Sequence, residues 1–321
     1  VALDDFDVET AAALREHLRI PGMGDTTARY FRDKLAMRMQ AQEMGILVPK
    51  FTPVFNHGEI RAFTHEVSPP WVLKPRSQAG AMGIRKVFGD DELWRTLEEL
   101  GDKASHFVLE QFVEGDIFHV DAIVSEREAV FAEVHRYWRP LLAVSHEGGV
   151  FITRTVGRQS REAKKLRDLN RNLMEALGMV RGVTHTEFIL GAEDNRFYFL
   201  ETAARVGGAN IAELVEHATG INLWAEWAAI ELGDIRGVAY ELPPAESDYA
   251  GILICLARQE HPDTSAYDDS EVVWRLDKKN HAGLIVASPD QARIEELLAD
   301  YSRRFATDFL AYVPPLEEAP A

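Results

Sequence analysis

The sequence is poor in cysteine and has no long apolar run. Cys255 is the one cysteine among 321 residues, so no disulfide can form within the chain. No apolar stretch approaches the ~20 residues that a membrane-spanning helix needs. A GxxxxGK[ST] loop is also absent, so this is not the sequence of a P-loop protein. We therefore expect a globular protein that is located in the cytoplasm.

Basic residues are also few. The chain has 35 lysines and arginines against 52 aspartates and glutamates, which gives a formal net charge of −17. A general nucleic-acid-binding protein needs a basic surface to contact phosphates, so this balance argues against that class. One bound nucleotide needs only a few local cations and stays compatible with the charge. The length and the 46% hydrophobic content predict a sizeable core in two or three lobes.

The apolar periodicity predicts alternating helices and strands. A helix is expected from a cap at Asp25 or Thr26 to about Met44, with Lys34 at the edge of its apolar stripe. The segment 1–5 has the character of a strand that ends an earlier domain. Further strands are predicted at 71–75, 84–88, 106–113, 117–124, 128–135, 182–190, 197–203, 251–257 and 282–288, and further helices at 90–101, 162–178 and 289–305.

Two acidic residues lie in the apolar strands of a predicted β-hairpin. If the chain turns about Asp194, Glu187 faces Glu201 and Ile189 faces Phe199 across the two strands. Opposed side chains point to the same face, with Cβ atoms roughly 4.5–5.5 Å apart. Two unpaired carboxylates would repel there, and Mg²⁺ would relieve the repulsion because it favours one or two carboxylates together with phosphate oxygens. The alternative is two acids on a solvated sheet face.

A lysine and a loop of small residues follow one another near the start of the chain. Lys74 lies inside the apolar segment WVLKP, where an ammonium group is costly unless it meets an anion. The next residues, RSQAGAMG (76–83), are small enough to bring backbone amides close to phosphate oxygens. Lys34 is a weaker candidate for a phosphate contact, because most lysines on helices are merely solvated.

The order of these features is more specific than any one of them. A helix lysine, a strand lysine, a small-residue loop, the acidic strand LEQFVEGD and the paired acids with a trailing Arg205 follow along the chain. In this order the sequence resembles the ATP-grasp superfamily, and within it the carboxylate–amine ligase branch of L-amino-acid ligases and biotin carboxylase-like enzymes. The resemblance runs from about Asp25 to Leu232.

The resemblance implies an α+β fold in which two α+β lobes clamp ATP. Residues 26–116 would form the N-terminal lobe with the glycine loop, and residues 117–240 the C-terminal lobe with the metal site. Residues 1–25 would end an N-terminal domain that starts before Val1, and residues 241–321 would form a small C-terminal α+β domain.

The resemblance also assigns ligands for ATP and for Mg²⁺, with Mn²⁺ as a substitute. Asp116 or Asp121 would hold the ribose, because Ile117 occupies the position usual for that acid. Glu187 and Glu201 would ligate the metal, while Ala203 replaces the asparagine that usually adds a third ligand. The residues expected to contact the nucleotide are Lys34, Lys74, Ser77, Gly80, Gly83, Glu110, Gln111, Val113 and Asp116.

The chemistry implied is C–N bond formation by an ATP-dependent ligase. A substrate carboxylate would attack the γ-phosphate while Mg²⁺, Lys74 and Arg205 offset the developing charge, and an amine would then displace phosphate from the acylphosphate. The segment 135–156 would recognise the substrates. Arg154, Arg136 and Arg139 are candidates for binding a carboxylate, with surface ion pairs as the alternative, and His146 or Glu147 for taking the amine proton.

Several alternatives stay open at the level of the sequence. His185 and His119 are either neighbours of Glu187 or packed side chains, and Arg205 could pair with Glu213 rather than act on substrate. The same fold could serve a carboxylase of the biotin carboxylase type, or a regulatory nucleotide-binding protein without turnover. Small-molecule carboxylates and amines, amino-acid-like in kind, are the expected partners, and a homodimer is one assembly that the sequence allows.

Overall fold

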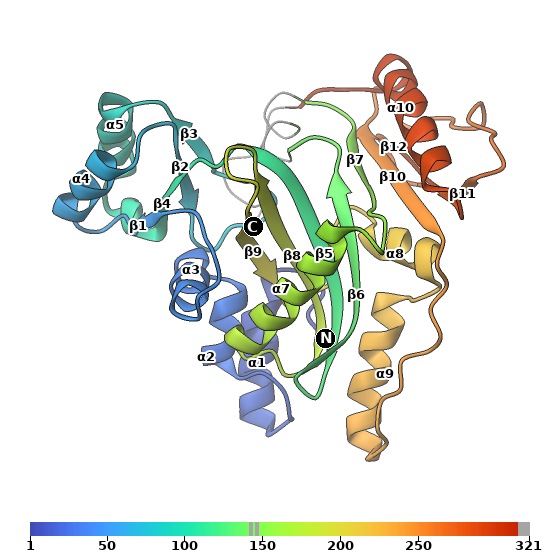
Figure 1. Cartoon of the computed structure of the whole chain (residues 1–321), viewed down its shortest axis with the longest axis horizontal. Helices are drawn as coiled ribbons and strands as arrows, with labels where there is room; N and C mark the ends of the chain where they lie inside the picture. The colour runs from blue at the N-terminus through green and yellow to red at the C-terminus, as the bar shows by residue number, and fades with distance from the viewer. Residues whose placement is uncertain (141–143, 145–147, 314–321) are drawn as a thin grey trace.

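The structure of the chain is a computed structural model (Figure 1) that describes residues 1–140, 144 and 148–313. Two antiparallel sheets form its two lobes. The smaller has the strand order β1-β4-β2-β3, and the larger has the order β11-β12-β10-β7-β6-β5-β8-β9. In the described part of the chain, no helix combines the length and the hydropathy that a membrane span requires.

The chain begins with a helical segment. It comprises α1 (Asp7–Leu18), α2 (Asp25–Ala28), a 3₁₀ turn (Arg29–Phe31) and α3 (Lys34–Glu43). The single helix predicted from residue 25 to 44 is wrong, because Asp33 is extended and its side chain accepts hydrogen bonds from the amides of Leu35 and Ala36. A new helix therefore starts at Lys34. The strand predicted at 1–5 is also wrong, since this segment forms a bend and a turn.

The smaller lobe lies on the left in Figure 1. Its sheet consists of β1 (Phe51–Pro53), β2 (Trp71–Pro75), β3 (Arg85–Val87) and β4 (Phe107–Gln111), with α4 (His57–Glu66) and α5 (Asp90–Leu100) packed on it. The three acids that open α5 complement the positive end of its dipole. Side chains from the strands and both helices, including Ile60, Trp71, Leu73, Leu93 and Leu109, form a common core.

The larger lobe is built on an eight-stranded sheet. Its strands are β5 (Gly115–Ser125), β6 (Glu128–Tyr137), β7 (Phe151–Thr155), β8 (Gly182–Gly191), β9 (Phe197–Ala203), β10 (Tyr249–Leu256), β11 (Val272–Arg275) and β12 (His281–Ser288). The strands after residue 241 extend this sheet through the pairing of β10 with β7. The predicted domain boundaries stay predictions, but the C-terminal strands share one sheet with the lobe before them.

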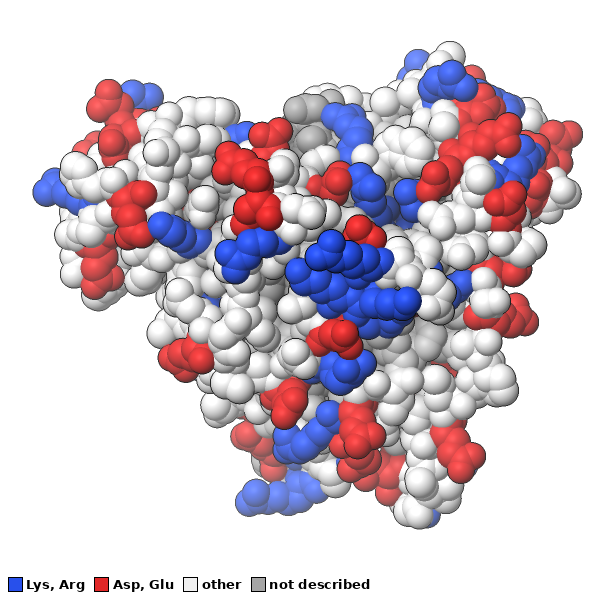
Figure 2. All heavy atoms as spheres, viewed as in Figure 1, with Lys and Arg blue, Asp and Glu red and all other residues white. Residues whose placement is uncertain are grey.

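Helices cover both faces of the large sheet. α7 (Arg161–Leu177) and α10 (Gln291–Asp308) pack on one face, and α8 (Ile211–Thr219) and α9 (Leu223–Arg236) pack on the other. Figure 2 shows lysine and arginine side chains gathered near the centre of the face in view, over α7. Among the basic residues of α7, Arg161, Lys164 and Lys165 are exposed.

The hairpin of β8 and β9 has the register that brings the two acids together. Glu187 pairs with Glu201, as predicted. A bulge after Glu187 then shifts the register by one residue, so Phe199 faces Phe188, and the predicted pairing of Ile189 with Phe199 is wrong. The bulge lies between the turn and the two glutamates, so it is the bulge that brings Glu187 opposite Glu201; in the register of the turn itself, Leu200 would face Glu187.

Candidate functional site

A cavity of about 830 Å³ lies between the two sheets, and both lobes contribute to its wall. The connection from β4 to β5, residues 111–117, runs along it. Of the predicted nucleotide residues, Lys74, Gly80, Glu110, Gln111, Val113 and Asp116 line this cavity. Glu187, Glu201 and Arg205 line it as well. Residues far apart in the sequence therefore meet at one cavity.

The glycine loop is anchored at its start and opens toward the cavity at its end. The carbonyl of Ser77 accepts from Nη2 of Arg32 at 2.6 Å, and that of Gln78 accepts from Nζ of Lys34 at 2.6 Å. Gly80 and Gly83 have φ values of 65° and 67°, a conformation that favours glycine. Gly80 lines the cavity, whereas Ser77 and Gly83 lie in the loop outside that lining.

Lys34 contacts one of the two predicted metal ligands. Its Nζ lies 3.0 Å from Oε2 of Glu201, and the lysine is only 5% exposed. Burial alone would raise the pKa of Glu201, but the charges of Lys34 and Lys74 outweigh it and lower that pKa to about 2. Glu201 is therefore ionised at neutral pH, in the form that can bind a cation.

Lys74 forms an ion pair with the buried Glu110, which is also paired with Arg38. Its Nζ lies 2.8 Å from Oε2 of Glu110, which also accepts from Nη2 of Arg38 at 3.2 Å. Nε of Arg38 lies 2.9 Å from Oε1 of the same carboxylate. Burial opposes ionisation of Glu110, yet Arg38 and Lys74 outweigh it and lower its pKa. The Glu110 side chain thus positions Lys74, a role the sequence reasoning missed together with Arg38.

Glu187 on β8 is bound by a tyrosine from β6, the strand on the other side of β5. The hydroxyl of Tyr137 donates to Oε1 of Glu187 at 2.9 Å. Burial, reinforced by the charge of Glu187, raises the pKa of Tyr137 well above its ordinary value, so the hydroxyl keeps its proton and stays a donor. Tyr137 also lines the cavity. Its place could have been inferred only from the pairing of β5 with both β6 and β8.

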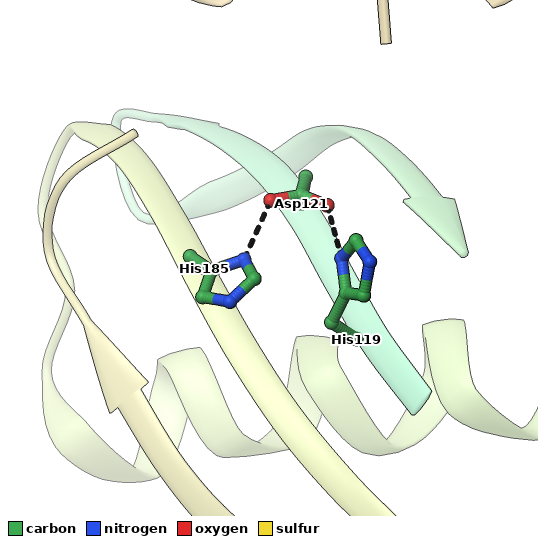
Figure 3. A group of neighbouring side chains, drawn as sticks. All are labelled: His119, Asp121 and His185. Carbon is green, nitrogen blue, oxygen red and sulfur yellow. Dashed lines mark hydrogen bonds and ion pairs between the residues drawn. The ribbon is translucent and has the colours of Figure 1, made fainter. Parts of the chain in front are cut away.

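Beside Glu187, on the same face of the sheet, a buried aspartate joins two histidines. Figure 3 shows these three residues. Oδ1 of Asp121 lies 2.8 Å from Nδ1 of His185, and Oδ2 lies 2.7 Å from Nδ1 of His119. His119 also bonds Thr153 through Nε2 at 2.8 Å. The three residues offer metal-ligand atoms within 4.8 Å of one another, but each N–O separation is that of a hydrogen bond. They form a hydrogen-bonded network that lies next to Glu187 on the same face of the sheet.

This placement corrects one expectation and resolves another. Asp121 is fully buried and bonded to the histidines, so it is not a candidate for holding a ribose. Asp116 does line the cavity, with its carboxylate 2.7 Å from Nη2 of Arg136. His185 lies next to Glu187, with Nε2 3.7 Å from Oε1.

Arg205 points at the cavity but has a partner that was not foreseen. Its Nε donates to Oδ2 of Asp5 at 2.7 Å, and Nη2 lies 2.6 Å from the same oxygen. Nη1 donates to the carbonyl of Val206 at 2.8 Å. The alternative pairing with Glu213 is therefore wrong, and the carboxylate that meets Arg205 comes from the start of the chain.

The prediction of Arg154 as a catalytic residue is not supported by its position. Side chains alternate along β7, so Thr153 faces the histidines while Arg154 points to the opposite face. There Nη2 of Arg154 lies 2.8 Å from Oε1 of Glu295 on α10. The predictions for His146 and Glu147 concern positions outside the described residues.

The histidine network predicts how stability depends on pH in the metal-free protein. Burial lowers the pKa of His119 to about 3, so between pH 6.5 and 3 the unfolded chain binds a proton that the folded chain does not. Burial opposes the charge of His185, but Asp121 and Glu187 outweigh burial and raise the pKa of His185 to about 9. The contribution of the charged His185 to the free energy of unfolding is therefore lost as the pH rises from 6.5 to 9. We expect a stability maximum near pH 6.5, with slopes of up to about 1 kcal/mol per pH unit on either side.

Urea unfolding in EDTA at pH 5, 6.5 and 8.5 checks this expectation. The variant His119→Gln should flatten the curve between pH 5 and 6.5 and leave the decline toward pH 8.5 in place. Exposed His261 on the C-terminal segment serves as the control, because His261→Gln should leave both slopes unchanged. Equal stability at all three pH values in the unmodified protein would contradict the assignment.

The fold and the site can now be compared with known proteins. A family model described as the ATP-grasp domain matches residues 67–213, from just before β2 to the start of α8. The chain therefore contains an ATP-grasp domain, as the order of its motifs predicted. Among solved structures, an L-amino acid ligase from Bacillus licheniformis has a TM-score of 0.72 at 20% identity, covering 97% of this chain and 79% of that protein.

Among curated relatives, an L-arginine-specific L-amino acid ligase of Bacillus subtilis is 27% identical over 231 residues, covering 70% of this chain and 55% of the relative. An alanine–anticapsin ligase of Bacillus subtilis is 24% identical over 233 residues, covering 65% and 48%. A D-alanine–D-alanine ligase of Ralstonia pickettii is 24% identical over 222 residues, covering 66% and 67%. The chain thus spans about half the length of the first two of these relatives.

Proposed function

We propose that this protein is an ATP-dependent carboxylate–amine ligase that forms an amide or peptide bond and releases ADP and phosphate. The observation that carries the proposal is the convergence of two opposed carboxylates, Glu187 and Glu201, with the ammonium group of Lys74 at one cavity, while Lys34 lies outside the cavity lining and contacts Glu201. A nucleoside triphosphate with a divalent cation needs this combination of charges. The names of the relatives support amino-acid-like substrates.

The acidic pair fits Mg²⁺, or Mn²⁺ in its place. Glu187 and Glu201 are opposed on one face of the sheet, and Glu201 is ionised at neutral pH. Ala203 follows on the same face opposite His185 and offers no ligand, so substrate oxygens or water would complete the coordination. When bound, the cation would withdraw charge from the transferred phosphoryl group.

The rest of the cavity fits the nucleotide. Val72 and Ile189 supply apolar walls on opposite sides, one from each sheet, and the segment 111–113 offers backbone groups between them. Lys74, held by Glu110, and Lys34, held by Glu201, lie toward the carboxylates, where the phosphates would be. Gly80 and Ala81 of the glycine loop reach the same cavity.

The reaction would proceed in two displacements. A substrate carboxylate oxygen forms a bond to the γ-phosphorus while the bond to the ADP oxygen breaks. The amine nitrogen then attacks the acyl carbon, phosphate leaves with the electron pair of the C–O bond, and the nitrogen gives up a proton. Lys34, Lys74 and Arg205 would offset the charge on the phosphoryl oxygens, and the cavity walls from both lobes would limit the access of water. The described residues contribute positioning and charge, with no covalent intermediate on a side chain.

A steady-state assay of ADP and phosphate release over pooled amino acids tests this function. Turnover that depends on an amine-bearing acceptor is the expected result. Dependence on bicarbonate instead would show a carboxylase, and ATP binding without turnover would show a regulatory nucleotide-binding protein.

We also propose that the protein is located in the cytoplasm and that it assembles as a homodimer. Size-exclusion chromatography with light scattering measures the assembly.

A nucleotide should protect the glycine loop from amide exchange. The start of the loop is already anchored through Ser77 and Gln78, so the change is expected at 79–83, where Gly80 reaches the cavity. The protein is measured with Mg²⁺ and with a non-hydrolysable ATP analogue at 100 times the Kd of the analogue. Amides that exchange only when the analogue has dissociated should then exchange roughly 100-fold more slowly. Hydrogen–deuterium exchange with mass spectrometry measures it.

The exposed turn at 126–127, between β5 and β6, is the internal control for this experiment, because it lies outside the cavity lining and its exchange should stay constant. Unchanged exchange at 79–83 in a protein that binds the analogue would contradict the role of the loop in covering the phosphates.

A further inference from the structure

We propose that Asp5, in the turn before α1, is a positioning residue for the ligase reaction, holding Arg205 toward the cavity and linking it through Arg32 to the glycine loop. The inference rests on the proposed function, because it assigns a partner to the arginine that we place at the transferred phosphate. Asp5 belongs to the segment 1–25, which the sequence reasoning left outside the site.

The first support is the contact between Asp5 and Arg205. A guanidinium group carries five N–H donors in one plane, and here one carboxylate oxygen meets both Nε, at 2.7 Å, and Nη2, at 2.6 Å. Nη1 donates to the carbonyl of Val206, so the plane is held from two sides. The side chains of both residues are about 15% exposed, which shields the pair from solvent. The partners hold the Arg205 plane in one orientation before any substrate binds.

The second support is Arg32, which meets the other oxygen of the same carboxylate. Its Nη1 lies 3.8 Å from Oδ1 of Asp5, and its Cζ lies 5.0 Å above the ring of Phe6. Arg32 is 4% exposed, so its charge requires compensation. Among the described residues, Asp5 is the acid that forms an ion pair with Arg32, and Nε of Arg32 has no hydrogen-bond partner.

Arg32 in turn holds the glycine loop. Its Nη2 donates to the carbonyl of Ser77 at 2.6 Å, directly before the residues that reach the cavity. One carboxylate therefore stabilises two arginines, of which one anchors the loop and the other faces the cavity. Loss of Asp5 would leave both arginines without their common counter-charge, and Arg205 would become free to adopt other rotamers.

A merely structural role for Asp5 predicts a different outcome from a positioning role. A structural residue changes stability and leaves the chemical step alone, whereas a positioning residue changes kcat while ATP affinity stays nearly constant. Asp4 supplies a matched control in the same turn. Oδ1 of Asp4 accepts from the amides of Phe6, at 2.7 Å, and Asp7, at 3.1 Å. Asp4→Asn therefore removes the same charge and keeps an acceptor, without touching either arginine.

The experiment compares three single variants, Asp5→Asn, Asp4→Asn and Arg205→Lys. It also includes the double variant that combines Asp5→Asn with Arg205→Lys. We expect Asp5→Asn to lower kcat by roughly 10- to 100-fold, below or at the scale of losing a direct donor. Its KM for ATP should stay within about threefold of wild type. Its Tm should be lower than that of Asp4→Asn, because Arg32 and Arg205 lose their counter-charge, so kcat is compared at a temperature at which both variants are folded. In the Arg205→Lys background, Asp5→Asn should add little, because the two residues act as one unit.

Three results would overturn the inference. A kcat for Asp5→Asn equal to that of Asp4→Asn would make the contact structural. A higher kcat would show that Asp5 withholds Arg205 from the phosphate. Full additivity of the two substitutions would show that they act separately.

A readout without turnover separates this inference from the proposed function. If the wild-type protein binds the ATP analogue but turns over no amino acid, the proposed function fails, and with it the role in catalysis. The link to the loop is then tested by amide exchange at 79–83. The factor by which the analogue slows exchange there should be at least about threefold smaller in Asp5→Asn than in Asp4→Asn. Equal protection in the two variants would overturn the link as well.

Discussion

Replacing Glu110 with glutamine is expected to lower the free energy of unfolding by about 3–5 kcal/mol, the cost of removing one partner from a buried ion pair. The carboxylate is 1% exposed and lies between Arg38, whose side chain is 0% exposed, and Lys74. Glutamine fits the space and keeps one acceptor but carries no charge. Arg38 would remain buried without its counter-charge, and the protein cannot relieve this by deprotonating an arginine.

Urea unfolding with a shared m-value measures this change. Glu128→Gln at the exposed start of β6 is the matched control, and its effect should stay within about 0.5 kcal/mol. A loss below about 1 kcal/mol for Glu110→Gln would show that water or a rearranged Arg38 compensates the charge.

Replacing both Glu187 and Glu201 with glutamine is expected to remove detectable Mg²⁺-dependent turnover, and either substitution alone should cost at least roughly 100-fold in kcat. The two carboxylates face each other across the hairpin, and amide oxygens bind Mg²⁺ far more weakly than carboxylates do. Calorimetric titration of Mg²⁺ into the protein with ADP should show the same loss.

The two single variants should differ in stability. Glu187→Gln keeps an oxygen that can accept from Tyr137, whereas Glu201→Gln leaves the buried Lys34 without its carboxylate. In EDTA, Glu201→Gln should therefore have the lower Tm. Glu193→Gln in the exposed turn of the same hairpin is the control for both properties. Retained turnover in the double variant would exclude the metal site.

The sequence predicted the part of the candidate site that carries the two acids, Lys74 and the glycine loop. The opposition of Glu187 and Glu201 was predicted by counting residues about Asp194, but the turn sets a register one residue away from that count, and the bulge restores it at the two glutamates. Lys74 and the glycine loop followed from a charge in an apolar strand and from small residues next to it. In each case the signal lies within about 20 residues of chain.

The partners of these groups could not be predicted in the same way. The bulge after Glu187 shifts the register by one residue, and no local pattern in the hairpin announces it. Arg154 was expected in the site, but the pleat of β7 turns it toward Glu295 on α10. The direction of a side chain depends on which strand pairs with β7, and that pairing involves residues about 100 positions away.

The sequence by itself determined where helices start and stop and which motifs occur in which order, because caps, glycines and alternation act between near neighbours. Ser160, Asn222 and Asp290 each cap the helix that follows, and Gly178 ends α7 in a left-handed conformation. Only the tertiary structure decided which charges meet. Asp5 reaches Arg205 across 200 residues, and Arg38 reaches Glu110 across 72. Burial makes a counter-charge necessary at these positions, but any of the chain's 52 acids could supply it until the packing of the lobes selects one.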